Sequence, residues 1–104
     1  MNSYKVQYWL YAIFAKQFKN EVRMDRSSLH SRYAVNRHDF TVSSNSIAPS
    51  VLRKFVDSEL IKSQYQREES RYKMELNNKE FNVFIYETKT GLAISIFSYK
   101  RIPA

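Results

Sequence analysis

No cysteine occurs in this sequence of 104 residues. Disulfide bonds, zinc sites built from thiolates and cysteine nucleophiles are therefore excluded together. Glycine occurs once and proline twice, so a glycine-rich loop that cradles phosphate cannot form. With so few residues that break helices and strands, regular secondary structure should dominate over loops.

The sequence also lacks an apolar run long enough to cross a bilayer, and it lacks the basic start, apolar stretch and cleavage site of a signal peptide. We therefore expect a cytoplasmic protein. A single domain over residues 1–104 is expected, because this length suits one core and 43% of the residues are hydrophobic.

Basic residues outnumber acidic ones by 17 to 10, which gives a formal net charge of +7. Such a charge favours an acidic partner, most commonly nucleic acid. Residues 1–26 contribute +3 (five basic, two acidic), residues 27–62 contribute +2 (five and three) and residues 63–104 contribute +2 (seven and five). No basic tail holds the charge, so folding must assemble any positive face.

The middle of the chain predicts a short amphipathic helix that runs directly into a hairpin. Ser46 is a good N-cap, and Pro49 falls early enough that its missing N–H costs no helical hydrogen bond. The pattern then alternates over residues 61–66, breaks at a polar tip over 67–70 and alternates again over 71–76. The helical spacing is carried by Val51, Leu52, Phe55 and Val56.

This helix and hairpin resemble winged helix-turn-helix DNA-binding domains, whose recognition helix ends in a small residue followed by Leu-Ile before the wing. The corresponding step here is Ser58, Glu59, Leu60 and Ile61, with Glu59 where the family often has glycine. The resemblance covers residues 46–76. It implies an α+β winged-helix domain that binds double-stranded DNA and is not an enzyme, with no cofactor and no metal.

On this resemblance the helix over residues 47–57 enters the major groove and the wing meets the backbone or the minor groove. Asn45 and Ser46 would hold phosphate at the helix start, Arg53 would make a bidentate contact to guanine, and Arg67 at the tip would insert into a groove. Ordinary solvated charge is the alternative for each basic residue. The predicted DNA-binding residues are Asn45, Ser46, Ser50, Arg53, Lys54, Lys62, Arg67, Arg71 and Lys73.

A helix is predicted over residues 4–20, which contain neither glycine nor proline. Apolar groups cover most of its circumference, and the polar side chains occupy one narrow wedge. Because a small monomer has difficulty enclosing such a helix, we expect a two-fold homodimer with this helix in the interface. The alternative is a central core helix whose tyrosine hydroxyls reach water.

Residues 21–45 carry a weaker pattern. Ser27 or Ser28 could cap a short helix through Val35, which would be the first helix of the helix-turn-helix unit. Residues 38–42 form either a short extended piece or a long connection. Ser43, Ser44 and Asn45 are turn-forming residues just before the expected recognition helix.

The C-terminal part predicts a hairpin of strands 81–86 and 92–99. The only glycine, Gly91, falls where a hairpin turn requires a positive φ angle. The first strand is apolar on both faces, with Phe81, Val83 and Ile85 on one side and Phe84 and Tyr86 on the other. Such a strand is sandwiched or covered by a partner, so the hairpin is a second candidate for a dimer contact.

Enzymatic patterns are weak. His30 and His38, with Asp25 and Asp39 nearby, do not have the spacing of metal ligands on one helix. The function predicted from these patterns is a dimeric DNA-binding regulator or a plasmid or phage DNA adaptor. The alternatives are a small phage or plasmid module that inhibits a host protein and, less favoured, a small basic ribonuclease toxin. DNA binding requires the basic groups to converge on one face with the helix over residues 47–57 exposed. Scattered basic groups, with that helix buried in a dimer, would favour the module that binds a host protein.

Overall fold

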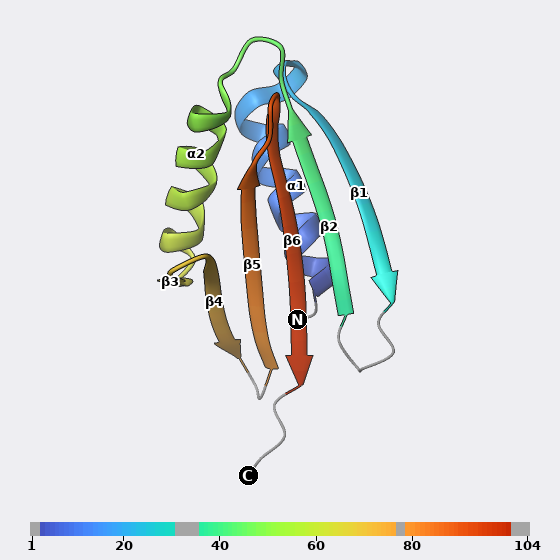
Figure 1. Cartoon of the computed structure of the whole chain (residues 1–104), viewed down its shortest axis with the longest axis vertical. Coiled ribbons are helices and arrows are strands. Elements are labelled where there is room, and N and C mark those ends of the chain that lie inside the picture. Colours follow the sequence, from blue (N-terminus) through green and yellow to red (C-terminus); the bar gives the residue numbers. More distant parts are fainter. Residues whose placement is uncertain (1–2, 31–35, 77–78, 101–104) are drawn as a thin grey trace.

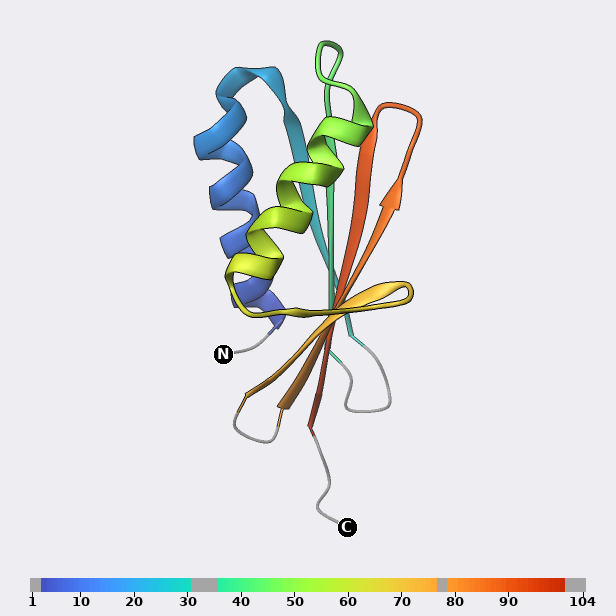
Figure 2. The same cartoon turned by 90° about the vertical axis from the view of Figure 1, so that its left-hand side faces the viewer.

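The computed structural model describes residues 3–30, 36–76 and 79–100. Two helices lie against one face of a six-stranded sheet (Figures 1 and 2). The helical elements are α1 (Ser3–Phe18), the 3₁₀ turn η1 (Lys19–Glu21) and α2 (Pro49–Lys62). The strands are β1 (Arg23–His30), β2 (Asn36–Ser43), β3 (Gln66–Glu68), β4 (Arg71–Leu76), β5 (Lys79–Glu87) and β6 (Gly91–Lys100).

The strands are arranged in the order β1-β2-β6-β5-β4-β3, and all neighbours are antiparallel. Two units built from local pairs make up this sheet: the β1–β2 pair and the meander from β3 to β6. The β2–β6 pairing joins them and runs from Asn36 opposite Ser98 to Ser43 opposite Gly91. The second strand and the last strand of the sequence therefore lie side by side in the sheet.

The winged-helix prediction is wrong, although the mixed α+β class is confirmed. Only two helices accompany a sheet that dominates the described residues, whereas a winged helix is built around a helical unit. The predicted helix continues through Ile61 to Lys62, and the first hairpin strand is only Gln66–Glu68. The longer helix adds Leu60 to the buried stripe of Leu52 and Val56, and this burial favours helix over strand. The second hairpin strand, Arg71–Leu76, is confirmed.

The predicted helix that starts at Ser27 or Ser28 is also wrong, because residues 27–30 belong to β1. Residues 31–35, its remaining part, lie outside the described residues. β1 is paired along its whole length with β2, and these long-range hydrogen bonds outweigh a local capping preference. The extended alternative for residues 38–42 is confirmed by β2.

The N-terminal helix is confirmed as α1, but it is not buried all round. Its buried stripe includes Leu10 and Phe14, whereas Tyr4 and Tyr8 are 51% and 53% exposed. Polar contacts with β2 fix its position: Gln7 Nε2 donates to the carbonyl oxygen of Asp39 over 2.6 Å.

The core lies between the two helices and the sheet. The buried hydrophobic residues are Val6, Leu10, Phe14, Phe40, Val42, Leu52, Val56, Leu60, Tyr65, Tyr72, Phe81, Val83, Ile85, Leu92, Ile94 and Ile96.

Within the described residues no helix has the length and apolar character needed to cross a membrane.

The start of α2 differs from the sequence prediction. Its N-cap is Ala48, which makes no side-chain capping bond, and Pro49 occupies the first turn as expected. Ser44 organises the preceding loop instead of Ser46, since its Oγ accepts from the N–H groups of Ser46 (3.1 Å) and Ile47 (3.0 Å). The loop before α2 is thus closed by its own hydrogen bonds.

The C-terminal hairpin is confirmed by β5 and β6, but the reason given for Gly91 is wrong. No glycine has a positive φ angle. Instead, a Cβ atom at this position would collide with the carbonyl oxygen of Val42 and lie 2.8 Å from Ser43 Cα. Gly91 is therefore required by the close approach of β2.

We expect Gly91→Ala to destabilise the fold by about 1–3 kcal/mol, because backbone atoms of β2 must move to admit the methyl group. Urea unfolding measures this change. Ala93→Gly, at a neighbouring position of the same strand, is the comparison and should cost about 1 kcal/mol or less. A wild-type unfolding free energy for Gly91→Ala would contradict the packing explanation.

Candidate nucleic-acid interface

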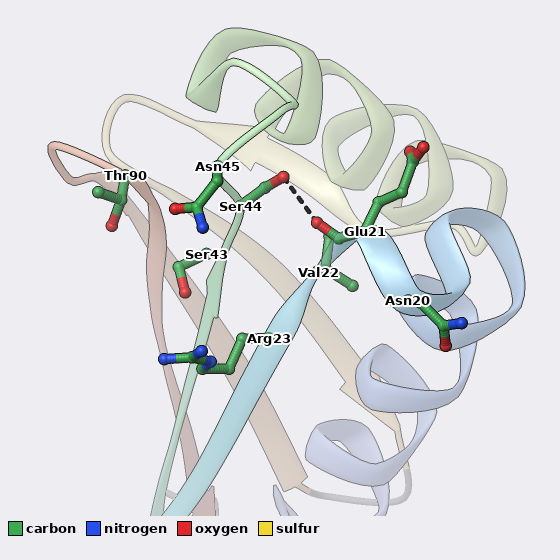
Figure 3. A pocket seen from close by; sticks show the side chains of 8 residues that line it. All are labelled: Asn20, Glu21, Val22, Arg23, Ser43, Ser44, Asn45 and Thr90. Carbon is green, nitrogen blue, oxygen red and sulfur yellow. Dashed lines mark hydrogen bonds between the residues drawn. The ribbon is translucent and has the colours of Figure 1, made fainter.

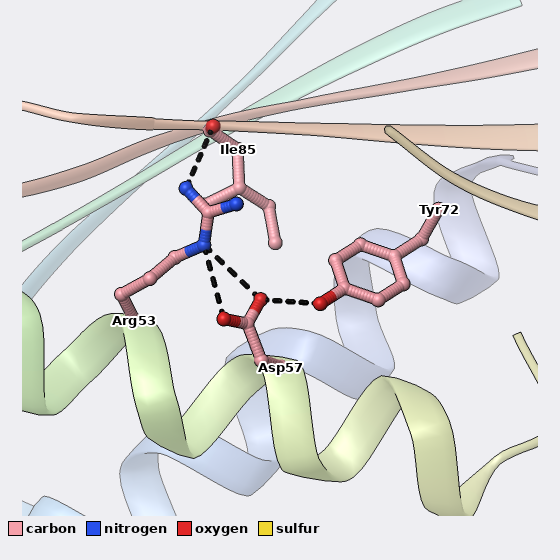
Figure 4. Close-up of polar contacts among 4 residues, drawn as sticks. All are labelled: Arg53, Asp57, Tyr72 and Ile85. Carbon is pink, nitrogen blue, oxygen red and sulfur yellow. Dashed lines mark hydrogen bonds and ion pairs between the residues drawn. The ribbon is translucent and has the colours of Figure 1, made fainter. Parts of the chain in front are cut away.

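Arg53, the predicted guanine contact, is held in a polar network between α2 and the sheet (Figure 4). Its Nε donates to both carboxylate oxygens of Asp57, over 3.1 and 3.3 Å, and its Nη1 donates to the carbonyl oxygen of Ile85 over 3.1 Å. Tyr72 donates its hydroxyl proton to Asp57 over 2.6 Å. A major-groove contact by Arg53 would require these bonds to break.

Burial and the Asp57 contact alter the ionisation of Tyr72. Burial first, and then the hydrogen bond to Asp57, raises its pKa from the ordinary 10.0 to about 12. Burial alone raises the pKa of Tyr65 to about 12 as well. Both phenols therefore stay neutral in the folded protein over a pH range in which the unfolded chain ionises.

Two of the basic residues predicted in the wing, Arg71 and Lys73, are paired with acids. Arg71 Nη2 lies 3.0 Å from Glu68. Lys73 Nζ lies 3.4 Å from Glu75 and 3.3 Å from Glu80, and the hydrogen bonds to these two carboxylates raise the pKa of Lys73. Because both side chains are paired with carboxylates, neither offers a phosphate group an unpaired positive charge.

The remaining predicted residues are exposed and scattered over several elements. Asn45 and Ser46 lie in the loop before α2, Ser50 and Lys54 on α2, and Arg67 on β3. Lys62 lies at the end of α2, 3.9 Å from Glu59. The structure therefore does not bring the nine predicted residues onto one face.

Asn45 lines a polar hollow of about 460 Å³ at the end of the molecule where the loop before α2 meets the β5–β6 turn (Figure 3). Ser44 closes one side by donating to the carbonyl oxygen of Glu21 over 2.6 Å. Arg23 is the only cation among the residues that line the hollow. This hollow contains one of the predicted phosphate contacts, but Ser46 does not line it.

A different surface combines exposed aromatic rings with cations. Tyr4, Tyr8 and Tyr11 follow one side of α1, with ring centroids 6.3 Å apart for the first pair and 6.4 Å for the second. Arg26 reaches this row from β1: its guanidinium carbon lies 5.5 Å from the Tyr8 ring centroid and 4.8 Å from that of Tyr11. Lys19, which lines a groove together with Tyr11, adds a second cation. We call this surface the α1–β1 surface: Tyr4, Tyr8, Tyr11, Lys19 and Arg26.

The α1–β1 surface arises from the packing of α1 beside the edge of the sheet. Arg26 lies opposite Phe40 in the β1–β2 register, and Phe40 is buried beneath α1. Side chains alternate along a strand, so Arg26 points to the helix side of the sheet and Asp25 to the other side. Tyr11 also contacts Phe40, with ring centroids 6.4 Å apart and an edge-on arrangement. The guanidinium therefore rests on rings that the core itself positions.

Charge on this surface is largely uncompensated. The sequence of α1 contains no acidic residue, and Arg26 and Lys19 form no ion pair within the described ranges. A shallow groove of about 720 Å³ continues the surface between α1 and β1, where Tyr11, Lys19 and Met24 line it. Lys19 is the only cation among the described residues that line this groove, and Asn20 adds a further polar group beside it.

Sequence reasoning missed this surface. The residues 4–20 were interpreted as a helix to be covered by a second subunit, and Arg26 was only counted in the charge. One signal was available: tyrosines and lysines occur in that segment without any aspartate or glutamate. The contribution of Arg26 depends on β1, which was not predicted.

No cluster of three or more potential metal ligands occurs among the described residues. Comparisons with protein-family models, curated proteins and solved structures find no match to this chain.

We expect Arg53→Met to lower the free energy of unfolding by about 1–3 kcal/mol. The substitution removes the guanidinium that donates hydrogen bonds to the Ile85 carbonyl oxygen and to the Asp57 carboxylate. Nucleic-acid affinity should stay within about twofold of wild type. Lys54→Met, at the exposed neighbouring position, is the control and should change stability by about 0.5 kcal/mol or less. Unchanged stability with lost binding would instead support Arg53 as a base contact.

Alkaline pH should destabilise the protein through Tyr65 and Tyr72. Their folded-state pKa values lie above the unfolded value, so their stabilising contribution is complete below pH 10.0 and is lost as the pH rises toward about 12. Urea unfolding at increasing pH, with tyrosinate absorbance as a second signal, measures the loss. Tyr72→Phe should reduce this pH dependence; an unaltered dependence would contradict the assignment.

Proposed function

We propose that the protein binds single-stranded nucleic acid across the α1–β1 surface. The observation that carries the proposal is the combination of exposed tyrosine rings with cations that form no ion pair in the described part of the chain. Tyr8 is 53% exposed, and the Arg26 guanidinium lies over its ring. Aromatic rings and guanidinium planes are the groups on which unpaired bases stack.

A single strand fits this surface better than a duplex. In a duplex the bases are stacked on one another and offer only their edges, so exposed tyrosine rings gain little from them. In a single strand each base has a free face, and stacking contributes about 1–3 kcal/mol per base. The duplex prediction depended on a recognition helix, whereas Arg53 on α2 is engaged with Asp57 and Ile85.

Lys19 and Arg26 supply the sequence-independent part of the binding. Lys19 follows the row of tyrosines in the chain and lines the groove beside Tyr11, where it would contact the phosphate backbone. Together with Arg26 it gives about two phosphate contacts, which corresponds to a salt slope near −1.4 for a single strand. A role as a regulator or as a plasmid or phage adaptor stays a prediction.

We expect Tyr8→Ala and Arg26→Ala each to weaken single-strand binding by about tenfold or more, because each removes a stacking group. Arg67→Ala removes an exposed cation of the same type from β3 and should change affinity by less than about twofold. Fluorescence anisotropy of a labelled single strand at two salt concentrations measures all three variants. Thermal unfolding confirms that each variant is folded.

The same titration with a random-sequence duplex distinguishes the two modes of binding. Tighter binding to the single strand, with loss in Tyr8→Ala, supports the proposal. Tighter binding to the duplex, or equal losses in Arg67→Ala and Tyr8→Ala, would contradict it. Absence of binding to either nucleic acid would favour a protein partner instead.

A further inference from the structure

The sheet has a second face, which no helix of the described residues covers (Figure 2). On β5 and β6 the residues that point toward the helices, such as Val83 and Ile96, are fully buried. Because side chains alternate along a strand, the intervening residues point the other way. We call this side the open face, and its aromatic side chains are Phe84, Tyr86, Phe97 and Tyr99.

Three of these aromatic side chains contact one another in turn, and we call all four together the aromatic strip. The ring centroids of Phe84 and Phe97 lie 5.6 Å apart in an edge-on arrangement, and those of Phe97 and Tyr99 lie 6.3 Å apart and stacked. Tyr86 is 56% exposed and Tyr99 is 36% exposed. A connected exposed aromatic patch on a small protein marks an interaction surface.

Charges on both flanks of the aromatic strip occur in opposite pairs, unlike those of the α1–β1 surface. Arg37 on β2 lies 2.9 Å from Asp39, and its guanidinium carbon lies 5.3 Å from the Phe97 ring centroid. On the other flank Lys73 is paired with Glu80 over 3.3 Å. A polyanion gains little from such a face, so nucleic acid is not its natural partner.

A buried acceptor lies in the same region. Asn82 on β5 is fully buried; its Nδ2 donates to Glu80 over 2.8 Å, but its Oδ1 meets no donor in the described part of the chain. Its cross-strand neighbours are Phe97 and Lys73. An unpaired buried acceptor costs free energy, and because Asn82 is fully buried this cost belongs to the single chain.

We propose that two copies of the chain pack their open faces together around a two-fold axis. Each copy carries +7, so a homodimer forms most favourably through a face that lacks excess positive charge. The open face meets this condition, because its aromatic strip is flanked on both sides by ion pairs. In a two-fold contact the ion pairs on each flank of one copy then face positive and negative side chains of the other copy.

This interface is expected to be modest in size. Strands β2, β6, β5 and β4 at about 4.8 Å spacing give a face about 19 Å wide. The turn between β3 and β4 rises on this side at one edge and limits the contact there (Figure 2). A face of this width is narrow for a standard interface, which covers roughly 800 Å² per partner.

Sedimentation equilibrium of the full chain, without nucleic acid and from low to high micromolar concentration, tests the dimer. Tyr86→Glu places a charge on the aromatic strip and should raise the dissociation constant at least tenfold. Tyr8→Glu is the matched control, because it changes an equally exposed tyrosine on the α1–β1 surface and should leave dimerisation unchanged. Circular dichroism confirms that both variants fold.

A monomer over the whole concentration range would overturn the inference. A dimer lost in Tyr8→Glu but kept in Tyr86→Glu would overturn it too, by placing the contact on α1. Because the measurement contains no nucleic acid, its failure leaves the proposed binding across the α1–β1 surface intact. Single-strand binding lost in Tyr86→Glu but kept in Tyr8→Ala would contradict both proposals.

Discussion

The antiparallel pairing of β2 with β6 joins the two parts of the sheet. It brings residues 36–43 against residues 91–98, and the approach is so close at Gly91 that no side chain fits there. α1 depends on the same pairing, because Gln7 donates to the backbone of β2 and Phe14 packs on Phe40, with ring centroids 5.9 Å apart. The position of every group on the α1–β1 surface follows from this connection.

One consequence of the layered fold is a separation of charge between its two sides. The helix side carries cations such as Arg26 beside tyrosine rings, whereas the open face carries Arg37 and Lys73 in ion pairs. A face-to-face dimer would leave the helices outermost, with one α1–β1 surface on each side. Such an assembly would hold two single-stranded nucleic acids on opposite sides, so it would bridge two nucleic-acid strands rather than wrap one.

Local patterns in the sequence predicted the elements that depend on near neighbours, namely α1, β4 and the β5–β6 hairpin. They failed where distant contacts decide: β1 forms because β2 is available to pair with it, and α2 extends to Lys62 because Leu60 finds a place in the core. The candidate site shows the same division. The net charge pointed to nucleic acid, and the spacing of four residues on α2 is enough to pair Arg53 with Asp57. The contact of Arg53 with Ile85 and that of Arg26 with the α1 tyrosines depend on the fold, so no local pattern predicts them.

Trp9 is the only tryptophan of the chain, and it stacks on Tyr65 with ring centroids 6.4 Å apart and planes inclined by 2°. This contact joins α1 to the segment that follows α2. Trp9 lines a small hollow with Lys5 and Tyr65, on the side of α1 away from Arg26 and the row of tyrosines. The protein therefore contains its own fluorescent reporter, whose emission follows the docking of the two helices and is separated in space from both interaction surfaces.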